Sequence, residues 1–289
     1  MPKTIALVGA GRVGQTLARA LRQRGYRIGM VVTAHAATAK AAARFIGAGT
    51  PATGPVPELA KADILLLTTP DREVASMARR LARLPVGWRG RVVLHTSGAL
   101  SSRELAPLRA RGAAVGSCHP IYPFPRPLRR FPRGVVFDLE GDRRAMKEAM
   151  GLARSLGGLP IQLNAQGKAL CHAAGTLVAG HLMALVDLGT RGLIRAGVPR
   201  RLAWPALQPL VRETLAGYGR WGAAAWTGPL QRGDVGTVRR HLTALRALPH
   251  PYREVYLTLA RASVALYRKR QSAATRELRR LLGMRSWVR

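Results

Sequence analysis

The stretch Thr4–Gly14, TIALVGAGRVG, constrains the fold more than any other part of this 289-residue chain. An apolar run typical of a buried β-strand leads into Gly9, Gly11 and Gly14, and a helical pattern begins near Arg12. In such a turn the first glycine permits a tight bend, the second admits a pyrophosphate to the backbone, and the third lets helix and strand pack closely. The free N–H groups and the positive dipole of the helix start attract phosphate. The stretch predicts a dinucleotide site, rather than a plain turn between strand and helix.

Strand-like and helix-like segments alternate through the first half of the chain, which is typical of a parallel sheet covered by helices. The predicted strands are 5–8, 27–32, 64–67, 92–94, 113–116, 135–138 and 160–163, and the predicted helices are 13–23, 36–45, 73–84, 101–111 and 143–156. The proline-rich segment Cys118–Pro132 is expected to be a loop. From Gln166 onward apolar residues recur at helical spacing. We therefore expect an α/β domain over residues 1–164 and an all-α domain over residues 165–289.

The charge is strongly positive, with 47 Lys and Arg against 14 Asp and Glu and a net charge of +33. Such a charge attracts polyanions, acidic membrane surfaces or small anionic ligands. The arginines are spread over nearly every segment, and aromatic residues make up only 5%, too few to indicate stacking platforms for nucleic acid. We expect nucleic acid to bind only non-specifically, if it binds, and most of the arginines to be solvated surface residues.

The sequence gives no indication of a membrane span, a signal peptide or a metal site. The most apolar run, Leu170–Gly189, is interrupted by His172, His181 and Asp187, and a span needs roughly 20 predominantly apolar residues. Its two cysteines are far apart and form no C-x-x-C pair, which predicts neither a disulfide framework nor zinc. We expect a cytoplasmic protein that does not enter a membrane and holds no metal.

Small and polar residues follow the carboxyl ends of the predicted strands, where ligands bind to open parallel sheets. The candidate cofactor-binding residues are Gly9, Gly11, Arg12, Val13, Gly14, Thr33, His35, Thr68, Thr69, Pro70 and His95. Ser97 and His119, which follow two later strands, are candidate substrate-binding residues. An ordinary turn would also explain the polar residues at 68–71.

The end of the second strand favours NADP(H) over NAD(H). NAD sites usually carry an acid there for the ribose 2′-hydroxyl, whereas the 2′-phosphate of NADP requires donors or cations. No acid occurs between Arg27 and Glu58, and Thr33 and His35 follow the strand.

The first helix of the second half places Lys168, His172 and Thr176 on one face, at spacings of four residues. An ammonium and an imidazole there could hold a substrate carboxylate and protonate a nascent alkoxide, so Lys168 and His172 are the candidate catalytic residues. A solvated lysine and a core histidine are the alternatives.

A glycine- and proline-rich turn in the second half supplies three further candidate substrate-binding residues, Thr227, Arg232 and Asp234. Asp234 could equally be the N-cap of the following helix.

Together these motifs resemble the two-domain Rossmann-like family whose C-terminal half is called domain of unknown function 2520. The matching segments are GAGRVG, HTSGAL from His95, CHPIYPF from Cys118, KALCHAAGTLVAGH from Lys168 and TGPLQRGDVGTVRRHL from Thr227. The chain departs from the usual pattern at Gly180-His181 and at Thr33-Ala34-His35. The wider relatives resemble ketopantoate reductases, pyrroline-5-carboxylate reductases, prephenate dehydrogenases and β-hydroxyacid dehydrogenases, in which a Rossmann-type sheet domain precedes a helical domain that forms homodimers.

The resemblance implies an NADPH-dependent reductase of a small 2-oxo acid, with ketopantoate as the leading substrate and Lys168 as the residue that assists carbonyl reduction. Dehydrogenases of the prephenate or pyrroline-carboxylate type are the alternative among enzymes. A non-catalytic NADP(H) sensor or polyanion-binding module is the alternative of another class.

Overall fold

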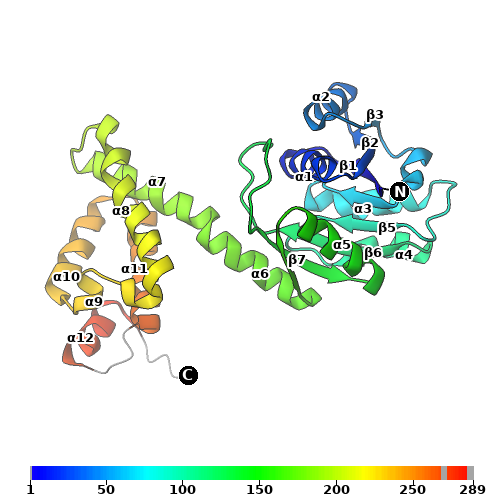
Figure 1. Cartoon of the computed structure of the whole chain (residues 1–289). Coiled ribbons are helices and arrows are strands. Elements are labelled where there is room, and N and C mark those ends of the chain that lie inside the picture. Colours follow the sequence, from blue (N-terminus) through cyan, green and yellow to red (C-terminus); the bar gives the residue numbers. More distant parts are fainter. Residues whose placement is uncertain (1, 268–271, 285–289) are drawn as a thin grey trace. The chain divides into compact units, whose positions relative to one another are not determined.

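The computed structural model describes residues 2–267 and 272–284, and the chain divides into two compact units, Met1–Gly180 and His181–Arg289 (Figure 1). We expected a boundary between residues 164 and 165. In this division α6 (Ala165–Val178) is part of the first unit.

The first unit is built on one sheet, whose eight strands among the described residues have the order β3-β2-β1-β4-β5-β6-β7-β8. The strands are β1 (Thr4–Val8), β2 (Arg27–Thr33), β3 (Thr50–Thr53), β4 (Ile64–Leu67), β5 (Val92–His95), β6 (Ala114–Pro120), β7 (Val136–Gly141) and β8 (Leu159–Gln162). All neighbouring strands are parallel except β6 and β7. The α/β fold class is confirmed, with one antiparallel pair that the sequence analysis did not anticipate.

The antiparallel pairing of β6 with β7 follows from the connection between them. A parallel pair needs a crossover, usually a helix, whereas residues 121–135 contain four prolines and form no helix. The chain therefore turns back beside β6. The expected loop was also too long at its start, because Cys118–Pro120 belongs to β6.

Helices cover both faces of the sheet (Figure 1). They are α1 (Arg12–Gln23), α2 (Ala36–Ile46), α3 (Asp71–Ala82), α4 (Ala106–Ala110) and α5 (Arg143–Ser155), with 3₁₀ turns at Pro57–Lys61 and Ser102–Leu105. Helix α6 follows β8 and leads away from the sheet (Figure 1). Side chains of β4 alternate between the two cores: Ile64 and Leu66 pack with α1 and α5, and Leu65 and Leu67 pack with α3. Burial on both faces explains why this strand reads as an unbroken apolar run.

The second unit is helical in its described part, as expected. Its helices are α7 (Gly180–Arg195), α8 (Arg200–Trp221), α9 (Pro229–Arg232), α10 (Val235–Ala244), α11 (His250–Tyr267) and α12 (Ala273–Leu281), with 3₁₀ turns at Gly222–Ala225 and Leu245–Ala247. Its core consists of apolar side chains from α10, α11 and α12, among them Val238, Val264 and Leu278.

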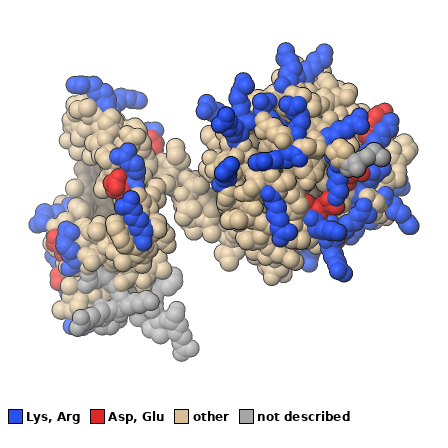
Figure 2. Space-filling model, viewed as in Figure 1, with Lys and Arg blue, Asp and Glu red and all other residues tan. Residues whose placement is uncertain are grey.

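Basic side chains are spread over the surface of the first unit. On the face seen in Figure 2, Lys and Arg are spread over much of the Met1–Gly180 unit, and the acidic side chains are fewer and lie on one side of it. The positive charge is therefore not concentrated in one block on this face.

Candidate active site

The glycine turn after β1 packs tightly against the end of β4 but is open at its middle. Gly9 has φ +84°, and a Cβ there would lie 2.6 Å from the backbone nitrogen of Thr69. The hydroxyl of Thr68 donates a hydrogen bond to the carbonyl of Gly9. A Cβ on Gly11, in contrast, would meet no atom within 4 Å. The turn thus leaves free space at the glycine that was expected to admit a pyrophosphate.

The start of α1 offers backbone donors beside this space. Gly11 is the N-cap of the helix, and no side chain caps its first turn. The first N–H groups of an α-helix have no partner within the helix, so those of Arg12 and Val13 are available to a ligand. Phosphate groups are favoured at such a position by both the donors and the helix dipole.

Two polar side-chain atoms at the ends of neighbouring strands are buried without a hydrogen-bond partner within the described part of the chain. They are Oγ1 of Thr69, beyond β4, and Nε2 of His95, the last residue of β5. Burial lowers the pKa of His95 to about 4, so its ring is neutral near pH 7. Its Nδ1 accepts a hydrogen bond from the N–H of Ser97 at 3.2 Å, which leaves the ring proton on Nε2. Buried groups of this kind are costly unless a ligand pairs with them.

These features fit a dinucleotide. The open space at Gly11, the uncapped helix start and the unpaired atoms of Thr69 and His95 all lie on or next to turns at the carboxyl edge of the sheet. Pro70 completes this edge as the N-cap of α3.

The end of β2 presents little negative charge. Thr33 donates its hydroxyl hydrogen to the carbonyl of His35 at 2.8 Å, and His35 is the N-cap of α2 without a side-chain cap. The backbone donors of α2 and the ring of His35 are therefore available there.

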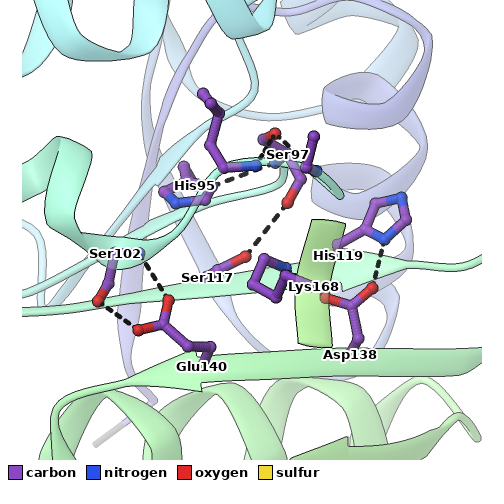
Figure 3. Close-up of polar contacts among 10 residues, drawn as sticks. His95, Ser97, Ser102, Ser117, His119, Asp138, Glu140 and Lys168 are labelled. Carbon is purple, nitrogen blue, oxygen red and sulfur yellow. Dashed lines mark hydrogen bonds and ion pairs between the residues drawn. The ribbon is translucent and has the colours of Figure 1, made fainter. Parts of the chain in front are cut away.

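A cluster of three side chains lies between the sheet and α6 (Figure 3). His119 and Asp138 are directly opposite each other in the antiparallel pair β6–β7, so their side chains share a face of the sheet. The Nδ1 of His119 is 2.6 Å from Oδ2 of Asp138. Nζ of Lys168, from α6, donates a hydrogen bond to Oδ1 of the same carboxylate. The side chains of Asp138 and Lys168 are both completely buried.

Asp138 is the centre of this cluster. Burial would by itself raise the pKa of its carboxyl group, but hydrogen bonds from His119 and from Lys168 outweigh burial and hold that pKa below its usual value. A carboxylate therefore faces an ammonium in the interior, and its second oxygen orients the imidazole.

His172 and Gly98 lie beside His119. The rings of His119 and His172 are 5.9 Å apart in an edge-to-face arrangement. A Cβ on Gly98 would lie 2.7 Å from Cε1 of His119 and 2.6 Å from Cδ2 of His172. The glycine backbone thus packs directly against both rings.

Ser97 has a structural role in the same loop. Its hydroxyl oxygen accepts hydrogen bonds from the N–H groups of Ala99 and Leu100 at 3.2 and 3.0 Å. Its carbonyl accepts one from Ser117 at 3.2 Å (Figure 3). These contacts fix the loop that contains Gly98.

The remaining candidates, Thr227, Arg232 and Asp234, belong to the second unit. Asp234 is the N-cap of α10, and its Oδ1 accepts a hydrogen bond from the N–H of Thr237 at 2.9 Å. That bond lowers the pKa of its carboxyl group. The alternative role as a helix cap is thereby confirmed for Asp234.

Asp138 is the site residue that the sequence analysis missed. Asp138 is the last residue of the predicted strand 135–138. The candidate residues were chosen instead from strand ends that carry histidines. An acid within the apolar run Val135–Leu139, in a chain with only 14 acidic residues, was the available signal, because a charge in a buried strand requires a partner.

Two family models match the chain. A Rossmann-like domain matches residues 3–120, and the domain of unknown function DUF2520 matches residues 135–263. The chain thus has a Rossmann-like N-terminal domain and a DUF2520 C-terminal domain. His119 lies in the first match, and Asp138 and Lys168 lie in the second. A search of curated proteins found no match.

Several solved structures share the fold. A protein from Bacteroides fragilis described as a candidate NADP oxidoreductase is 20% identical, with a TM-score of 0.72 over 91% of this chain and 98% of that one. An imine reductase from Pseudomonas sp. is 18% identical, with a TM-score of 0.64 over 90% and 93%. A reductive aminase from Aspergillus terreus, solved with NADPH and ethyl-5-oxohexanoate, is 16% identical, with a TM-score of 0.67 over 97% and 100%. At these identities the likeness establishes the fold alone.

Proposed function

We propose that the chain is an NAD(P)H-dependent oxidoreductase that reduces a small carbonyl or imine compound. The observation that carries the proposal is the combination, within one unit, of an open glycine turn and a buried Lys168–Asp138–His119 cluster. The turn fits a dinucleotide, and the cluster presents an oriented imidazole for proton transfer. A bound reduced nicotinamide would supply the hydride.

NADPH is the favoured cofactor. The carboxyl end of β2 carries no acid to repel a 2′-phosphate, and His35 with the uncapped start of α2 would provide donors to it. The reductive aminase of the same fold was solved with NADPH, and an imine reductase of the same fold from Myxococcus stipitatus was solved as a variant with NAD⁺. The excess of basic residues would attract either anionic cofactor.

The substrate class is the finer part of the proposal. The resemblance to ketopantoate reductases favours a small anionic 2-oxo acid, with ketopantoate first, and the imine reductases of the same fold add imines. Dehydrogenation of a prephenate- or pyrroline-carboxylate-type substrate is the remaining enzymatic alternative.

The test is turnover by the purified full-length chain with a panel of 2-oxo acids, including ketopantoate, and of imines. We expect oxidation of NADPH with at least one of these compounds, and weaker binding of NADH than of NADPH, measured by cofactor fluorescence. Binding of NADPH without any turnover would support the sensor instead. If neither cofactor binds, the proposal is wrong.

We also propose that the chain forms a homodimer through helices α6 and α7. The stretch Ala165–Arg195 is long and apolar enough to cross a membrane by length and composition, and none of its most apolar 18 residues is buried. The side chains of Leu170, Leu177 and Val178 are 74%, 64% and 73% exposed. A second copy is favoured over a membrane because Lys168, in the same stretch, is held inside the first unit by Asp138.

The dimer predicts a mass in solution of twice 31.2 kDa by light scattering after gel filtration. Leu177→Glu is expected to shift the equilibrium to monomer, because burial of one such side chain contributes about 1.5–3 kcal/mol. Leu159→Glu is the matched control, since Leu159 is 58% exposed but lies on the edge strand β8. A monomeric unaltered protein would contradict the proposal.

A further inference from the structure

Solvent exposure increases along the cluster of Lys168, Asp138 and His119. The ammonium group at one end is fully buried, and the imidazole at the other end is partly exposed. The side chains of Lys168 and Asp138 are 0% exposed, whereas that of His119 is 19% exposed. Lys168 and His119 bind different oxygens of the Asp138 carboxylate (Figure 3).

Lys168 is poorly placed to give a proton to a substrate. Its side chain is sealed from solvent, and Nζ is engaged with Asp138. Moving it toward a substrate would leave a carboxylate buried without its cation, and breaking a buried ion pair is strongly unfavourable.

His119 is placed differently. Its Nδ1 faces Asp138, and because an ionised carboxylate only accepts hydrogen bonds, Nδ1 carries a proton. Its Nε2 forms no hydrogen bond with the residues that the structure describes, and Figure 3 shows the opposite side of the ring turned away from Asp138. The ring of His172 lies edge-to-face beside it, and Gly98 packs against both.

We propose that His119 is the acid–base catalyst of the reaction, that Asp138 fixes its tautomer and orientation, and that Lys168 is a positioning residue acting through Asp138. This inference rests on the proposed oxidoreductase function. In reduction, the carbonyl carbon gains the hydride that a reduced nicotinamide supplies, and the oxygen gains the proton that leaves Nε2 of His119. The C=O bond becomes CH–OH, and the imidazole is left neutral to regain a proton from solvent.

The physical reason is that a carboxylate behind an imidazole stabilises the imidazolium and holds it in one orientation. Lys168 in turn keeps that carboxylate ionised in an apolar interior, where it would otherwise favour the protonated form. Among the other titratable groups, His172 from α6 lies beside His119. Cys118 from β6 and Cys171 from α6 interact electrostatically with Asp138. Burial raises the pKa of the Cys118 thiol to about 12, so it stays neutral.

The test compares His119→Asn with Lys168→Met in the full-length protein, with NADPH and the best compound of the panel. We expect His119→Asn to lower kcat by about 10²–10⁴-fold with an unchanged Kd for NADPH, and to remove the fall in kcat with rising pH. Lys168→Met is expected to lower kcat less and to retain that pH dependence. If Lys168 were the proton donor, its variant would lose the pH dependence and His119→Asn would keep it.

A second variant covers the case in which Lys168→Met fails to fold. Gly98→Ala adds one methyl group against the rings of His119 and His172, and we expect it to lower kcat without changing NADPH affinity. Gly151→Ala is its control, because a Cβ on Gly151 in α5 meets nothing within 4 Å. If the unaltered protein is active and His119→Asn has the same kcat, the assignment of His119 as the acid–base catalyst is wrong, while the proposed oxidoreductase function stands. An unaltered protein without turnover on the whole panel would overturn the proposed function and this assignment together.

Discussion

Lys168→Met is expected to lower the free energy of unfolding of the first unit by about 3–5 kcal/mol. The reason is that Asp138, which is completely buried, would keep only the hydrogen bond from His119. Hydrogen–deuterium exchange of peptides from β6, β7 and α6 measures the effect locally, and urea unfolding followed by circular dichroism measures it for the whole chain.

The double variant Asp138→Asn with Lys168→Met is the control for this prediction. Removing both charges removes the buried carboxylate that Lys168→Met alone leaves without its cation. We therefore expect the double variant to be more stable than Lys168→Met by itself. A Lys168→Met protein that is as stable as the unaltered chain would show that the ammonium does not neutralise Asp138.

Gly11→Asp is expected to abolish measurable NADPH binding while leaving the fold intact. Gly11 has φ −76°, which any residue can adopt, and a Cβ there meets no protein atom within 4 Å. Aspartate is a favourable N-cap and suits the positive end of the helix dipole. The same carboxylate would, however, occupy the space of a pyrophosphate and repel it. NADPH fluorescence titration and thermal unfolding without cofactor are the two measurements.

Gly11→Asn is the matched control, because it has the same shape without the charge. We expect it to weaken NADPH binding by about 10–100-fold, the equivalent of roughly 1.5–3 kcal/mol from lost hydrogen bonds to charged groups. The further loss in Gly11→Asp then measures the charge repulsion. Equal NADPH affinity in all three proteins would exclude this turn as the pyrophosphate site.

The secondary structure that the sequence predicted best is the most strongly buried. Strand β4 was predicted with its observed bounds, since its apolar run is covered on both faces. Strand β3 (Thr50–Thr53) was missed because its residues, TPAT, are largely exposed at the edge of the sheet and give no hydrophobic pattern. Helix α8 contains Gly217 and continues to Trp221, since glycine weakens a helix without ending it.

The sequence predicted most residues of the candidate site, but it did not predict the contacts between them. The glycine turn and the residues Lys168, His119 and His172 were all identified from local patterns. Spacing along a helix placed Lys168 and His172 together, but it could not reveal that Lys168 is buried against Asp138. The ammonium was therefore expected to face a substrate, whereas the structure pairs it with a carboxylate.

The sequence by itself determined the strand–turn–helix unit at Gly9–Gly14, the alternation of strands and helices, and the helical second half. These features depend on local conformation and on the periodicity of apolar residues. Both can be recognised within a short segment of the sequence. Only the tertiary structure decided that β7 runs antiparallel to β6, which sets His119 opposite Asp138, and that α6 brings Lys168 to the same carboxylate. The physical reason is that the pairing of strands and the packing of a helix on them join residues 19 and 30 positions apart, and no local pattern encodes that register.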